Sequence, residues 1–174
     1  TREEVHVICL FPSLEDALRF DALIYEKLLP FPNREDIFGK QQIMDERDEV
    51  AGTVENLLIN ATSVSFDDVF SLAGFFHGIA YPAHVDKAST SLLSNLGFVP
   101  PGSTFSCAEF HDFKNLHRIR REHPYFDDCN AIYCSDAHYL EDIHEPEYQI
   151  YAKSREICDI LEALTKGLPV HTDL

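Results

Sequence analysis

Apolar positions recur along the chain in two different periods, and together these periods predict strands that alternate with helices. Residues 5–11 (VHVICLF) form a short β-branched and apolar run, which indicates a buried strand. Residues 14–29 carry apolar side chains at the spacing of one helical face, which predicts an amphipathic helix. Ser13 is its candidate N-cap, and Pro30 and Pro32 are expected to end it.

The next segment is less regular and is expected to be an insertion. Within residues 31–60, the stretch DERDEV has the composition of a hairpin tip between two short strands. Ser65 then caps a predicted second helix, SFDDVFSLAGFFHG, and Gly78 is its expected C-terminal stop.

The second half of the chain continues the same alternation. We expect strands at 78–85, 105–110, 131–134 and 147–152, helices at 112–121 and 154–167, and a loop at 86–104 with a short helix candidate, STSLLSNLGF. Strands that alternate with helices predict an α/β fold with a mostly parallel sheet or barrel. We therefore predict a single domain over residues 1–174, with a small β-hairpin insertion.

Composition narrows the class of protein. Apolar residues make up 45% of the chain and no run has the length of a membrane span, so we expect a soluble globular protein. The net charge of −16 does not favour a surface that binds a nucleic acid duplex. The absence of a signal peptide pattern, and an odd number of cysteines without a CxxC motif, favour a cytoplasmic protein with reduced thiols.

Metal-competent side chains follow two of the predicted strands. His84 ends strand 78–85, while Asp136 and His138 follow strand 131–134. In α/β barrels, functional side chains lie at the carboxyl ends of the strands, but His6 lies near the start of its strand and does not obey this rule. Imidazole and carboxylate groups suit Zn²⁺, Mn²⁺ or Fe, so the set indicates a divalent metal site.

Each of these residues also has a simpler interpretation. His6 alone could be a hydrogen-bonded core residue, and His84 could be a turn residue after Pro82. Asp136 could form an Asx-type turn with Ser135 after its strand. Because these residues all lie in or next to strands of a chain in which strands alternate with helices, the metal site is the favoured interpretation of the set.

Three motifs carry a resemblance to a known family. YPAHVDK, SLLSNLGFVPP and CSDAHYLEDI together resemble the polymerase-and-histidinol-phosphatase (PHP) family of metal-dependent phosphoesterases. The resemblance implies a distorted (β/α)7 TIM-like barrel that binds up to three metal ions in its mouth. It also implies hydrolysis of a phosphomonoester, or of a nucleotide or oligonucleotide phosphodiester, by metal-activated water.

The same resemblance assigns roles to the four candidate ligands. It implies that His6 and His84 bind one metal ion beside a bridging Glu, that Asp136 binds a second ion, and that His138 binds a third. Lys87 is a candidate for holding a substrate phosphate, although a solvated surface lysine is the simpler interpretation.

The chain departs from the family pattern at its beginning. The HxH segment of the family is absent, and the position of its bridging Glu falls at or before Thr1. Glu3 and Glu4 lie close by, but neither has the spacing of the family. Glu4 is nevertheless expected to share a strand face with His6. The chain starts without Met and enters a strand almost at once, so we expect a C-terminal piece of a longer polypeptide that encodes about half of the site. Open sheet edges in such a piece would favour pairing with the missing segment or self-association.

Two other functions stay open at this point. The chain could be a non-catalytic barrel fragment that serves as a structural or partner-binding module. It could also belong to an amidohydrolase-like enzyme that cleaves C–N bonds, because similar metal barrels carry out that reaction. The sequence identifies neither the substrate nor the metal.

Overall fold

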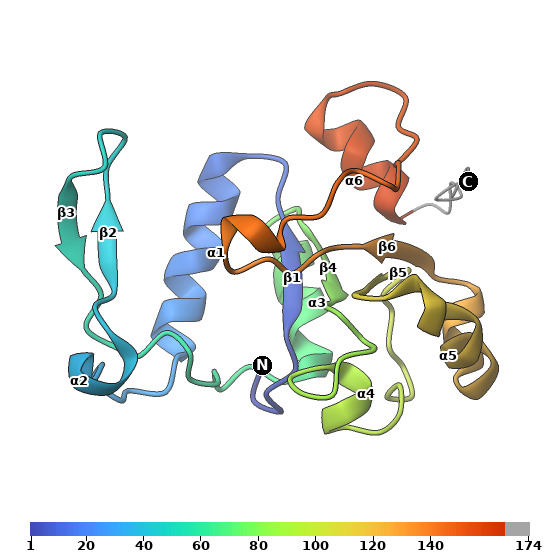
Figure 1. Ribbon diagram of the computed structural model, residues 1–174, viewed down its shortest axis with the longest axis horizontal. Helices are drawn as coiled ribbons and strands as arrows, with labels where there is room; N and C mark the ends of the chain where they lie inside the picture. The colour runs from blue at the N-terminus through green and yellow to red at the C-terminus, as the bar shows by residue number, and fades with distance from the viewer. Residues whose placement is uncertain (166–174) are drawn as a thin grey trace.

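Over residues 1–165, which the computed structural model describes, the protein has a mixed α/β structure with three small sheets (Figure 1). The strands are β1 (Val7–Leu10), β2 (Gln42–Met44), β3 (Val50–Thr53), β4 (Ile79–Pro82), β5 (Cys107–Phe110) and β6 (Asn130–Tyr133). The α-helices are α1 (Leu14–Lys27), α2 (Glu35–Phe38), α3 (Phe66–Phe75), α4 (Leu92–Asn95), α5 (Leu116–Glu122) and α6 (Ile157–Thr165). Short 3₁₀ turns, η1 (Phe113–Asn115), η2 (Pro124–Asp127) and η3 (Leu140–Asp142), complete the order.

Strand direction differs from the prediction of a mostly parallel sheet. Strand β1 pairs with β4 in antiparallel fashion, β2 pairs with β3 in antiparallel fashion, and β5 and β6 run parallel. Across residues 1–165 these pairs do not close into a barrel. The long connection between β1 and β4 lets the chain return in either direction, and the apolar pattern of a strand carries no information about its direction.

The β1–β4 and β5–β6 pairs nevertheless lie beside each other. The backbone nitrogen of Val85, just after β4, donates a 2.8 Å hydrogen bond to the carbonyl oxygen of Glu109 in β5. Beyond the strand pairs, Ala83 N donates to His6 O at 3.0 Å and so extends the contact between β4 and the start of β1. The carboxyl ends of β4, β5 and β6 therefore meet at one edge together with the amino end of β1.

The helix boundaries confirm the capping signals in the sequence. The hydroxyl groups of Ser13 and Ser65 accept hydrogen bonds from the backbone nitrogens of Asp16 and Asp68, at 3.1 Å each. Helix α3 ends differently from the prediction, because His77, with φ of 61°, takes the left-handed position expected of a glycine. Gly78 follows it and donates its N–H to Ala73 O at 2.9 Å, so it completes the C-terminal motif of the helix.

The predicted hairpin is present, whereas the strand predicted near the end of the chain is not. Strands β2 and β3 form the expected hairpin, which Figure 1 shows on the far side of α1 from β1. Residues 147–152 form no strand. Tyr148 instead packs its ring against Phe113 and Tyr133, with centroid distances of 4.6 Å and 4.5 Å. The last two positions of the predicted helix 154–167 lie outside the described residues.

The main hydrophobic core lies under β5 and β6 and fixes the edge where the strands end. Its largest fully buried side chains include Phe66 of α3, Phe110 of β5 and Phe126 of η2. Full burial of such a side chain contributes about 1.5–3 kcal/mol. A second cluster joins α1 to α3 through Phe20 and Phe76, whose rings meet edge to face at 5.9 Å. Within residues 1–165, every helix is too short or too polar to span a lipid bilayer.

Candidate active site

Four predicted site residues come from three strand ends that share one edge of the molecule. His84 lies two residues after β4, while Asp136 and His138 follow β6. His6 directly precedes β1 and reaches the same edge because β1 runs antiparallel to β4. The antiparallel pairing thus explains why a histidine at the beginning of its strand lies near side chains at the ends of other strands.

His6 and His84 form a close imidazole pair. Nε2 of His84 lies 3.3 Å from Nδ1 of His6, within hydrogen-bond distance when one of the two nitrogens carries the proton, and their ring centroids are 5.3 Å apart. His84 is buried, with 3% exposure, and burial is the main cause that lowers its pKa. His6 is exposed overall, but desolvation of the covered part of its ring also lowers its pKa. Both rings are therefore held in the neutral form, which is the form that binds metal ions.

Two of these residues have unusual backbone conformations. His84 has φ of 29° and Asp136 has φ of 51°, in the left-handed region that non-glycine residues rarely occupy. The His84 backbone is held from both sides: its N–H donates to Glu109 Oε1 at 3.3 Å, and its carbonyl accepts from Lys87 N at 3.0 Å. Asp136 N–H donates to Cys134 Sγ at 3.4 Å. Such conformations cluster at functional sites, where the surrounding structure holds them in place.

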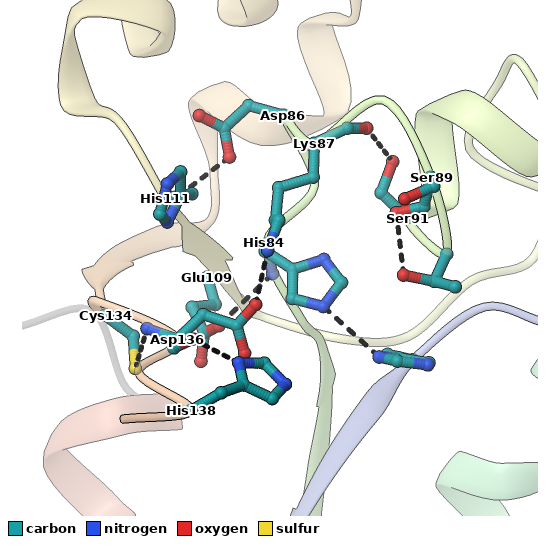
Figure 2. A network of polar contacts seen from close by, with 12 residues as sticks. His84, Asp86, Lys87, Ser89, Ser91, Glu109, His111, Cys134, Asp136 and His138 are labelled. Atoms are coloured by element: carbon teal, nitrogen blue, oxygen red, sulfur yellow. Dashed lines mark hydrogen bonds and ion pairs between the residues drawn. The ribbon is translucent and has the colours of Figure 1, made fainter. Parts of the chain in front are cut away.

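Asp136 and Lys87 form an ion pair at this edge (Figure 2). The Lys87 ammonium donates to Asp136 Oδ2 at 2.6 Å. Burial alone would raise the pKa of Asp136, but the hydrogen bond and charge of Lys87 outweigh burial and lower it. The Asp136 carboxylate is therefore held in the charged form, with the Lys87 ammonium as its counter-ion.

His138 lies at the outer side of the same group. Its side chain is exposed, and Nδ1 lies 2.8 Å from the carbonyl oxygen of Asp136, to which the ring donates a hydrogen bond when Nδ1 carries the proton. The charge of His138 contributes to the pKa values of His6 and Asp136, so the three side chains share one electrostatic environment. Figure 2 shows His138 next to Asp136, in the side-chain cluster that also holds His84 and Glu109.

Sequence reasoning missed two carboxylates that organise this edge. Glu109 of β5 is buried, with 5% exposure, and burial is the main cause that raises its pKa. Asp86 accepts hydrogen bonds from the backbone nitrogens of His111 and Asp112 at 2.7 Å and 2.8 Å, which ties the loop after β4 to the loop after β5. A glutamate inside the apolar run FSCAEF was the available signal for Glu109, because a lone carboxylate in a buried strand needs a partner.

Neither candidate for the bridging Glu lies in this group. Glu3 directs its carboxylate to the start of α3, where Oε2 accepts a 2.8 Å hydrogen bond from Phe66 N. Glu4 has φ of 58° and precedes the first strand, so it does not share a strand face with His6 as the sequence predicted. The bridging ligand of the family pattern therefore has no counterpart at these two positions.

The donor atoms fit a metal ion at one point of the site. Two nitrogen ligands of a tetrahedral Zn²⁺, each about 2.0–2.1 Å from the ion, are roughly 3.3–3.4 Å apart. The separation of 3.3 Å between His84 Nε2 and His6 Nδ1 agrees with that spacing. Among residues 1–165, however, no group of three or more His, Cys, Asp or Glu side chains is arranged to hold an ion. The described residues thus offer two ligands, His6 and His84, for one ion. The Asp136 carboxylate is paired with the Lys87 ammonium instead.

Comparison with known proteins gives a likeness of fold. No protein-family model matches the chain, and no curated protein matches it in sequence. The structure is similar to the crystal structure of PfuEndoQ, a lesion-specific endonuclease from Pyrococcus furiosus, with a TM-score of 0.60. The two chains share 14% identity, and the match covers 94% of this chain and 36% of the endonuclease. At this identity the similarity establishes a related fold, and the chain spans about a third of that enzyme's length.

Proposed function

We propose that this chain carries part of the active site of a metal-dependent phosphoesterase. The observation that carries the proposal is the His6–His84 pair, whose ring nitrogens lie 3.3 Å apart as two ligands of one tetrahedral ion would. The fold likeness to an endonuclease supports the same class of reaction, because an endonuclease cleaves phosphodiester bonds. The PHP-like motifs of the sequence point to this class independently, and a partial PHP-type barrel is consistent with the strand ends that meet at the site.

The residues present would take distinct parts. His6 and His84, both held neutral by desolvation, would bind one divalent ion, Zn²⁺, Mn²⁺ or Fe²⁺. Asp136 and His138, which follow β6, would contribute to the positions of further ions. A divalent ion in such a site polarises a phosphoryl oxygen and lowers the pKa of bound water. Glu109 and Lys87 hold the His84 backbone from both sides and so fix its ring towards His6.

Charge and fold likeness support a proposal for the class of substrate. We propose a phosphomonoester or a nucleotide or oligonucleotide phosphodiester. The net charge of −16 does not favour a broad electrostatic surface for duplex DNA, so a short or single-stranded substrate fits better. Lys87 is the cation next to Asp136 that could hold a substrate phosphate as a point charge.

Hydrolysis assays with a matched pair of variants test this function. We expect the full-length polypeptide that contains this chain to hydrolyse at least one member of a panel of p-nitrophenyl phosphate, bis-p-nitrophenyl phosphate and short oligonucleotides when Mn²⁺ or Zn²⁺ is present, and to lose this activity with EDTA. His84→Asn should reduce the rate at least about 100-fold, because Asn tolerates the left-handed backbone but removes the ring nitrogen.

The control is His117→Asn, which changes an exposed histidine on α5 in the same way. It should leave the rate within about twofold, as surface substitutions usually do. The absence of metal-stimulated hydrolysis across the whole panel would contradict the proposal. Cleavage of amide substrates alone would instead favour the C–N hydrolase.

A further inference from the structure

The insertion at residues 31–60 carries apolar side chains that lie outside the core. Among the described residues, none from 31–60 belongs to the hydrophobic core clusters. Ile43, Met44 and Val50 of the β2–β3 hairpin are 50%, 48% and 53% exposed, and Ile37 and Phe38 of α2 are exposed as well. Exposed apolar side chains that gather on one part of a protein indicate an interaction surface.

Polar contacts hold the hairpin in shape in place of a core. At its tip, residues 45–49, Asp45 Oδ1 accepts hydrogen bonds from the backbone nitrogens of Arg47 and Glu49 at 2.8 Å and 2.9 Å. At its base, Gln41 Nε2 donates to Val54 O at 3.1 Å. These contacts fix the backbone of the hairpin while its apolar side chains stay exposed, and a preformed surface loses less entropy when it binds a partner.

Met44 and Val50 form one apolar contact point on the hairpin. They lie opposite each other in the register of β2 and β3, so their side chains project from the same face. In the described part of the chain, β2 and β3 pair only with each other, and Figure 1 shows them apart from the other strands, with α1 between. A two-stranded hairpin is marginally stable by itself, so a partner that covers this face would also stabilise it.

The charge at the tip selects the kind of partner. Residues 45–49 have the sequence DERDE, so four carboxylates accompany a single guanidinium group. That group, on Arg47, lies 3.8 Å from Glu46 Oε1, and the tip as a whole stays negative. A second copy of this chain would bring the same negative charge to the contact, and like charges oppose such pairing. The complementary surface therefore carries Lys or Arg side chains around apolar ones.

We propose that the β2–β3 hairpin is a docking arm for a cationic amphipathic segment of a partner protein. Apolar side chains of that segment would cover Met44 and Val50, and its Lys or Arg side chains would face the acidic tip. The apolar contact supplies affinity, while charge complementarity selects the partner and speeds its approach. The inference is independent of the proposed phosphoesterase function, because the hairpin contains none of the residues of the candidate active site.

Two synthetic peptides that differ in charge test the chemistry of the partner. One is an amphipathic Leu/Lys peptide and the other is a Leu/Glu peptide with the same pattern, both labelled with fluorescein. Their binding to the full-length polypeptide that contains this chain is measured by fluorescence anisotropy. We expect the Leu/Lys peptide to bind at least about tenfold more tightly at low salt, and we expect added NaCl to reduce this difference because it screens the exposed charges.

A double variant tests the position of the contact. Met44→Ser combined with Val50→Ser should weaken binding of the Leu/Lys peptide about tenfold, because two half-exposed apolar side chains would no longer be buried on binding. The matched control is Phe75→Ser combined with Phe98→Ser, which removes two exposed apolar side chains outside the insertion. The control should change the affinity less than about twofold. Circular dichroism of both variants verifies that they are folded.

A second double variant tests the charge of the tip. Glu46→Gln combined with Glu49→Gln should weaken binding of the Leu/Lys peptide about threefold and reduce its dependence on salt.

Three results would overturn the proposal. The first is equal binding, or no binding, of the two peptides. The second is an equal loss of affinity in the Phe75/Phe98 control, which would place the contact elsewhere. The third is a wild-type protein that self-associates in analytical ultracentrifugation and becomes monomeric in the Met44/Val50 variant, because a second copy of the chain would then be the partner.

Discussion

At the scale of single residues, Glu3 illustrates how a charge near the site serves stability instead of chemistry. Burial alone would raise the pKa of Glu3, but the hydrogen bonds from Phe66 N and Arg2 outweigh burial and lower it. Because the folded-state pKa lies below the unfolded value, the charged form stabilises the fold above about pH 4.5, and this contribution is lost as the pH falls through the folded pKa.

The Glu3→Gln variant should therefore lose about 0.5–1 kcal/mol of unfolding free energy at about pH 7 relative to wild type. The difference should disappear at about pH 3, and urea unfolding at the two pH values measures it. Glu4→Gln removes the same charge from the exposed neighbour and is the control. An equal loss in both variants, or a loss that persists at the acidic pH, would contradict the role of Glu3 at the start of α3.

Side chains at the site could be identified from the sequence by their chemistry, whereas their partners depend on the fold. His84, Asp136 and His138 could be singled out because each follows an apolar run, which is a local signal. The Lys87–Asp136 ion pair joins positions 49 residues apart in sequence, and no local pattern predicts it. Glu109 is harder to identify, because the apolar run around it predicts only a strand, whereas its partner His84 N is 25 residues away in sequence.

At the scale of elements, Gly78 is the described glycine at which an added Cβ atom would clash with its neighbours. It links the end of α3 to β4, and a Cβ atom there would lie 2.5 Å from Phe11 Cδ1 and 2.7 Å from the backbone oxygen of Leu10. Gly78→Ala should therefore lower the unfolding free energy by about 1–3 kcal/mol through overpacking. Thermal unfolding followed by circular dichroism measures this effect.

The matched control, Gly74, lies in the last turn of α3. A Cβ atom at Gly74 would have no neighbour within 4 Å apart from the helix itself, so Gly74→Ala should keep or raise stability, by up to about 1 kcal/mol through helix propensity. Equal stability of wild type and Gly78→Ala would show that the start of β4 and the end of β1 do not approach each other as closely as the structure indicates.

Caps and periodicity are local properties of each element, and they were predicted well. Ser13 and Ser65 cap the helices that the sequence assigned to them, and the hairpin lies in the predicted insertion. The direction of β1 and the absence of a strand at 147–152 depend on which partners the chain meets in space, so the sequence pattern did not determine them. The direction of β1 matters most, because it brings His6 to His84.

At the scale of the whole molecule, the described residues form a mixed α/β unit. The ends of β4, β5 and β6 and the start of β1 lie at one edge, where the polar side chains of the candidate site are close together. The predicted α/β class is confirmed, while no barrel closes within residues 1–165. The chain spans about a third of the length of the endonuclease that its fold resembles. In the proposed function, the His6–His84 pair and Asp136 are the groups that these strand ends would contribute to a metal site.

The most direct test of this account is to locate a metal ion in crystals of the protein grown with Zn²⁺, by anomalous scattering at the zinc edge. The account predicts a peak that lies about 2.0–2.1 Å from both His84 Nε2 and His6 Nδ1, and the loss of that peak in His84→Asn. A structure with Zn²⁺ bound only elsewhere, or with the two imidazole rings still in direct hydrogen-bond contact at saturating Zn²⁺, would contradict it.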